Sequence, residues 1–192
     1  MLLIRLNGYD VDLHALDSPA DMLQLMLFTL GSQAVVARKA AQAFLAGGSD
    51  QQANAQVMVT AAGTAAAFIW PLPSRRKNLA EAFPRRGQDI QDLLGLSDNQ
   101  LTALKGLRDG MIHLDERIEE SWIIDPKRSL TMWAVTEAPV KDANFMSFNP
   151  ATKVFSLLQH EVSIPELIEI LGTIQRRSMD AFMLMAQVDD VE

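Results

Sequence analysis

Arg108, Asp109 and His113 combine side chains and spacing that could perform chemistry together. An arginine presents a planar fork of donors to a phosphate, and a histidine can move protons near neutral pH. Asp109 precedes His113 by four residues, which is the helical spacing at which a carboxylate can bond an imidazole and orient it. These three residues are therefore the candidate catalytic residues.

The segment around these residues has the pattern of a long amphipathic helix. The sequence Ser97-Asp98-Asn99-Gln100 predicts a capping box at its start, and Pro126 predicts its end, giving a helix from Asp98 to about Trp122. Apolar residues three and four positions apart predict one stripe that faces the core, formed by Leu104, Leu107, Met111, Leu114 and Ile118.

The same helical geometry places the candidate residues away from that stripe. Asp109 and His113 fall on the opposite face with Glu116 and Glu120, and Arg108 lies on the flank. Arg108 and His113 are about 140° apart around the helix axis, so a single helix aims them in different directions. They meet either through the reach of the arginine or across a symmetric dimer in which each helix supplies both residues.

The residues Arg108-Asp109-Gly110-Met111-Ile112-His113, followed by an acidic run, resemble the R-x4-6-H motif of the HEPN superfamily. The resemblance covers roughly residues 18–122 and the final helix. It implies a helical bundle that pairs as a homodimer through the Arg108–His113 helix, and it implies metal-independent ribonuclease activity without a cofactor. Some members of this family are inactive and serve as binding modules.

If the resemblance holds, Arg108 and His113 are the catalytic pair and Asp109 supports them. RNA is then cleaved by attack of its 2′-hydroxyl on the neighbouring phosphate, in an enzyme of toxin type held in check by an antitoxin-like protein partner. One basic segment of the chain supplies candidate phosphate contacts, at Arg75, Arg76, Lys77, Arg85 and Arg86. The alternative function is a catalytically inactive HEPN-like dimer that binds a protein or a nucleotide.

Two other interpretations of the candidate residues remain open. Arg108 and His113 could belong to an ordinary polar helix face, with contacts from Asp109 to His113 and from His113 to Arg117. The other interpretation is a metal site formed by His113, Glu116 and Glu120. The sequence has no second histidine at helical spacing to complete it. The other two histidines, His14 and His160, are near predicted hairpins, where we expect no chemistry.

Composition narrows the class of protein. The chain has 192 residues, a formal net charge of −7 and no cysteine, which argues against a non-specific nucleic-acid binder and against disulfides. The most apolar segment, residues 55–70, is shorter than the roughly 20 residues of a membrane span. We therefore expect a cytoplasmic protein without a membrane segment, folded as one domain over residues 1–192.

The remaining signals predict a mainly α fold, a bundle of four to five helices with a small β-hairpin at the N-terminus and another near residues 130–164. The Asn7-Gly8 turn predicts the first hairpin over residues 2–13. Helices are predicted over about 18–45, 50–70, 89–94 and 165–187, in addition to the candidate helix. A strand is predicted over 130–135, and a hairpin pairs 145–148 with 154–158 before a further strand at 162–164, so that hairpins cover about 2–13 and 145–164.

Overall fold

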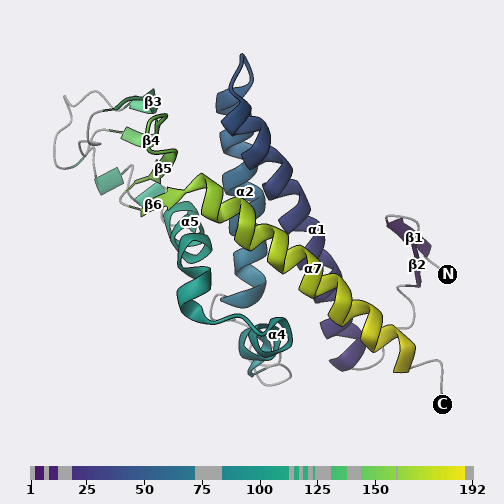
Figure 1. Cartoon of the computed structure of the whole chain (residues 1–192). Coiled ribbons are helices and arrows are strands. Elements are labelled where there is room, and N and C mark those ends of the chain that lie inside the picture. Colours follow the sequence, from purple (N-terminus) through teal and green to yellow (C-terminus); the bar gives the residue numbers. More distant parts are fainter. Residues whose placement is uncertain are drawn as a thin grey trace.

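The computed structural model describes residues 3–6, 9–12, 19–71, 84–112, 115–116, 119–120, 123, 131–137, 144–158 and 160–188. Within these ranges the chain is mainly helical, as predicted, with a four-stranded sheet on its C-terminal side. The sheet lies beside the end of the helices at which α1 (Pro19–Ala46) turns into α2 (Gln51–Ile69) (Figure 1). No helix in these ranges combines the length and hydropathy needed to cross a membrane.

The two long N-terminal helices begin and end close to the predicted residues. α1 starts at Pro19, and the positive φ angles of Gly47 (77°) and Gly48 (103°) lie in a region that favours glycine and ends the helix. α2 packs against α1, and most of its buried residues are small. The buried alanines of α2 are Ala55, Ala61, Ala62, Ala65 and Ala66, whereas Ala53 and Ala67 are exposed.

Two shorter helical segments lead to the candidate residues. α4 (Arg86–Leu94) begins three residues before the predicted start. The capping box at Ser97 is present as predicted. The backbone N–H of Ser97 donates to Gln100 Oε1 at 3.0 Å. It opens a 3-10 turn, η2 (Asp98–Leu101), and then α5 (Thr102–Ile112). Positions 115, 116, 119, 120 and 123 are also helical, while the continuity of the helix to about Trp122 stays a prediction.

The four-stranded sheet has the order β3-β4-β5-β6. Its strands are β3 (Thr131–Val135), β4 (Asn144–Asn149), β5 (Val154–Leu157) and β6 (His160–Ser163). The predicted hairpin is confirmed, because β4 and β5 pair antiparallel with Phe148 opposite Phe155. β6 continues the antiparallel series, whereas β3 pairs with β4 in parallel.

The N-terminal segment forms a separate pair of strands. β1 (Leu3–Leu6) pairs antiparallel with β2 (Tyr9–Asp12), which confirms the predicted hairpin. This pair is not hydrogen-bonded to the four-stranded sheet. The larger part of the β structure therefore belongs to the C-terminal side of the chain.

The last helix, α7 (Ile164–Val188), connects the sheet to the other helices. It packs along α1, where Gly31 approaches Ser178 and Gly172 approaches Arg38 closely enough that added Cβ atoms would lie at 3.3 and 3.2 Å. Arg177 Nη1 donates to the carbonyl oxygens of Leu94 (2.6 Å) and Gly95 (2.7 Å). These bonds satisfy carbonyls at the end of α4 that have no partner within their own helix.

An aromatic cluster joins the helices to the sheet. Phe44, near the C-terminus of α1, is fully buried. Its ring meets Phe148, Trp133 and Phe155 edge-on, with centroid distances of 4.6, 5.8 and 5.9 Å. Edge-to-face pairs of this kind contribute about 0.5–1.5 kcal/mol each beyond the burial of their area.

α5 lies between α2 and the sheet and depends on glycines at both contacts. A Cβ atom at Gly110 would lie 2.8 Å from Leu157 Cδ2, so a larger residue here would force the Leu157 side chain to shift. On the other side of α5, Met111 extends over Gly63 of α2, where a Cβ would lie 2.9 Å from the Met111 sulfur. The glycine inside the candidate motif therefore allows α5 to contact β5.

Replacing Phe44 with alanine should lower the free energy of unfolding by about 3–5 kcal/mol, because the change leaves a cavity among three aromatic rings. Chemical denaturation followed by circular dichroism measures this loss. Gln42→Ala alters an exposed side chain two residues earlier on α1 and should change stability by less than about 0.5 kcal/mol. Equal stability of the two variants would contradict the central role of this cluster.

Replacing Gly110 with alanine should destabilise the protein by about 1–3 kcal/mol, because the new methyl group overpacks the contact with Leu157. The matched variant is Gly106→Ala one turn earlier, where the nearest atom is His160 Cβ at 3.4 Å, an ordinary contact distance. Gly106→Ala should be neutral or stabilising by up to about 1 kcal/mol, since alanine favours the helix. Thermal unfolding of both variants checks the difference, and a stabilising Gly110→Ala would refute the close packing.

Candidate functional site

Arg108 and Asp109 form an ion pair on α5. Arg108 Nη1 lies 2.6 Å from Asp109 Oδ1, and the two side chains keep 12% and 32% of their surface exposed. The sequence predicted that Asp109 bonds His113 four residues on, but the carboxylate bonds its immediate neighbour Arg108. His113 lies outside the described residues, so its predicted position beside Asp109 stays a prediction.

Arg108 is buried more deeply than a residue of a solvated helix face. Its Nε atom is inaccessible and has no hydrogen-bond partner among the described residues. A buried donor without an acceptor costs free energy, so this guanidinium has donor capacity that the described part of one chain leaves unused. The interpretation of Arg108 and His113 as an ordinary polar helix face stays open, because His113 and Arg117 lie outside the described residues.

The rest of the helix follows the predicted division into two faces. Leu104 and Leu107 are fully buried and Met111 packs against the core from a partly buried position, whereas Leu114 and Ile118 lie outside the described residues. The opposite side carries an acidic surface. Glu116 and Glu120 of that side are exposed, and so are Asp115 and Glu119, which lie between the two faces.

The predicted basic segment is described only at its end. Arg75, Arg76 and Lys77 lie outside the described residues. Arg85 is exposed and its guanidinium lies 3.9 Å from the Asp92 carboxylate on α4. Arg86 begins α4 and is half-buried, and α4 packs against α2 and α7. The role of these five residues as phosphate contacts therefore stays a prediction.

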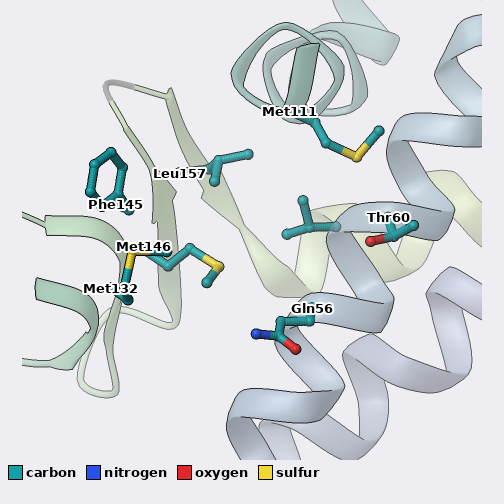
Figure 2. Close-up of a pocket in the computed structure, with 8 residues that line it drawn as sticks. Gln56, Thr60, Met111, Met132, Phe145, Met146 and Leu157 are labelled. Atoms are coloured by element: carbon teal, nitrogen blue, oxygen red, sulfur yellow. The ribbon is translucent and has the colours of Figure 1, made fainter. Parts of the chain in front are cut away.

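An apolar pocket next to α5 was not predicted from the sequence. This pocket has a volume of about 180 Å³ and lies between α2, the end of α5 and the sheet (Figure 2). Its lining comprises Gln56, Val59, Thr60, Met111, Met132, Phe145, Met146 and Leu157. These residues belong to five elements, so no local spacing announces them. Of these residues, only Met111 belongs to the motif that the sequence analysis identified, three residues after Arg108.

The structure tests the expectation for His160 and the hypothesis of a metal site only in part. His160, from which we expected no chemistry, is half-buried and packs beside Gly106 and Gly110. Among the described residues, no group of three His, Asp or Glu side chains could hold a metal ion. The alternative metal site includes His113 and is therefore only partly covered by this finding.

The comparisons with known proteins add no family to this geometry. No family model, no curated protein and no solved structure matches the chain.

Proposed function

We propose that this chain is a HEPN-like, metal-independent ribonuclease in which α5 supplies the residue that holds the phosphate. The observation that carries the proposal is the state of Arg108, whose side chain is 12% exposed and lies 2.6 Å from Asp109. A carboxylate that fixes a largely buried arginine leaves it oriented before the substrate arrives. Donors oriented in advance stabilise developing charge without reorganising during the reaction.

The proposed reaction needs two groups from the motif. His113 removes the proton from the 2′-hydroxyl, a bond forms between the 2′-oxygen and phosphorus, and the bond from phosphorus to the 5′-oxygen breaks. The leaving 5′-oxygen takes up a proton from water and His113 returns its proton to water, so the step balances without a metal. Arg108 donates to the phosphate oxygens, on which negative charge grows in the transition state.

The proposed site is completed by a second copy of the chain. Ideal helical periodicity predicts that Arg108 and His113 are about 140° apart, so a symmetric pair of helices would bring the arginine of one protomer to the histidine of its partner. Ile112 supports this arrangement, because it is half-buried on the side of α5 away from Leu104 and Leu107. The spare Nε donor of Arg108 would find its acceptor on the phosphate or on the partner.

A second function is favoured by the charges near Arg108. Asp109 compensates the charge of the guanidinium, and the acidic residues 115, 116, 119 and 120 are exposed along the same helix. This surface repels RNA and suits a basic partner. The alternative proposal is therefore a catalytically inactive HEPN-like dimer that binds a protein. Under this alternative the chain is not a toxin-type enzyme inhibited by an antitoxin-like partner.

RNA cleavage without metal distinguishes the two proposals. Purified protein is incubated with single-stranded RNA in EDTA, beside His113→Ala, Arg108→Lys and Arg176→Ala. Loss of the proton-transfer group should slow cleavage by about 10²–10⁴-fold. Arg108→Lys should also slow it, since lysine keeps the charge but loses the planar fork.

Arg176→Ala removes an exposed arginine of α7 and should leave the rate unchanged. Circular dichroism confirms that each variant is folded. Absence of cleavage by the unaltered protein supports the inactive dimer, and equal cleavage by all four proteins contradicts the assignment of the site.

A shared site predicts complementation between two inactive variants. Arg108→Ala and His113→Ala subunits carrying different affinity tags are co-expressed, and the heterodimer is isolated through both tags. Part of the cleavage activity should return, because one cleft receives an intact arginine from one protomer and an intact histidine from its partner. A heterodimer as inactive as each homodimer, with active unaltered protein, would place the pair within a single chain.

A further inference from the structure

We propose that the pocket between α2, α5 and the sheet, defined by the eight residues that line it, binds a small neutral aromatic molecule of one or two rings. This proposal does not rest on the proposed ribonuclease chemistry, and neither Arg108 nor Asp109 belongs to the described lining. The class of ligand follows from the volume of the pocket, the chemistry of its walls and the position of its polar groups.

The volume sets the size of the ligand. The pocket holds about 180 Å³, and an engineered apolar cavity of about 150 Å³ in another protein binds benzene. A benzene or indole ring system therefore suits the available space, whereas a nucleotide with its sugar and phosphates does not. No lining residue carries a charge, which excludes a ligand whose own charge would be buried without a partner.

The walls favour an aromatic ring over a saturated chain. Three methionines line the pocket, Met111 from α5, Met132 from β3 and Met146 from β4. Thioether sulfur atoms make favourable contacts with aromatic rings, of about 0.3–1.5 kcal/mol each, and the flexible side chains adapt to the ring. Figure 2 shows the side chains of Met111 and Met146 extending toward α2 from two different sides.

One part of the lining is fixed and the other is adaptable. Phe145, Met146 and Leu157 are 3%, 8% and 2% exposed, so the sheet provides a packed wall. Met111 is held against Gly63, where even a Cβ atom would lie 2.9 Å from its sulfur. Met132 is 47% exposed and can move over a bound ring at the entrance. The pocket is thus formed before the ligand arrives, which reduces the cost of ordering on binding.

The polar side chains of the lining all come from α2. Gln56 and Thr60 are exposed residues one turn apart on α2, and they are the two polar members of the lining. Few polar groups beside an apolar wall is the usual composition of a small-molecule site, where the polar groups fix orientation. A ring with one N–H or O–H group, such as indole or phenol, can bond to the polar side chains while its ring contacts the apolar wall.

The test uses indole as the probe and the methionine methyl groups as reporters. The full chain is labelled with ¹³C at these methyl groups and titrated with indole, and their resonances are followed by NMR. Saturable shifts should occur at Met111, Met132 and Met146. Met58 is fully buried in α2 and does not line the pocket, so its resonance should stay in place and report an intact fold.

Two variants on the same helix locate the site. Gln56→Trp fills the entrance and should weaken indole binding at least tenfold, whereas Gln52→Trp changes an exposed glutamine one turn earlier, outside the lining, and should bind as the unaltered protein does. Met132→Trp closes the entrance from the sheet side and gives a second blocking variant if Gln56→Trp does not fold. Benzoate, a charged ring of similar size, should not bind.

The following results would overturn the proposal. Shifts that do not saturate, or that spread over methionines outside the lining, would mean non-specific adsorption of indole. Equal loss of binding in Gln56→Trp and Gln52→Trp would place the site elsewhere. Shifts in the three methyl groups that depend on protein concentration in the absence of indole would assign the pocket to a side chain of a second copy.

Discussion

The contact between Phe44 and the aromatic residues of the sheet sets the geometry of the rest of the molecule. It fixes β3, β4 and β5 relative to the end of α1, through rings from each of these strands. β5 and β6 in turn provide the surface on which Gly110 and Gly106 of α5 rest. The position of Arg108 and the width of the methionine-lined pocket both follow from this chain of contacts. A shift of the sheet would therefore move the candidate catalytic residues and the pocket together.

Local signals in the sequence were sufficient to predict most elements. Pro19, Gly47 and the Ser97 capping box act within one turn of the chain, so the helices they bound were predicted to within a few residues. The hairpin between β4 and β5 was predicted for the same reason. The parallel pairing of β3 with β4 was not predicted, because it joins strands whose relation depends on tertiary contacts. The need for glycine at position 110 was equally out of reach, since Leu157 is far from it in sequence.

The same difference between local and tertiary signals applies to the candidate site. The two faces of α5 follow from helical periodicity, and the burial of Leu104 and Leu107 agrees with it. Sequence alone could not predict that Asp109 bonds Arg108, because two neighbouring residues on a helix usually point apart. The pocket requires five elements at once and has no signature in the order of the residues. Periodicity thus assigns faces, while tertiary packing decides which atoms on a face meet.

The bonds from Arg177 to the end of α4 have a consequence for synthesis of the protein. α7 is the last of the described elements in chain order, yet it covers α1 and donates to the carbonyl oxygens of Leu94 and Gly95. A nascent chain that has left the ribosome only as far as β6 has made α1 and α4 but has neither their covering helix nor this cap. The apolar side of α1 that later faces α7 remains in contact with water or chaperones until then. The final packing of α1 and the cap of α4 therefore form only after α7 has been synthesised.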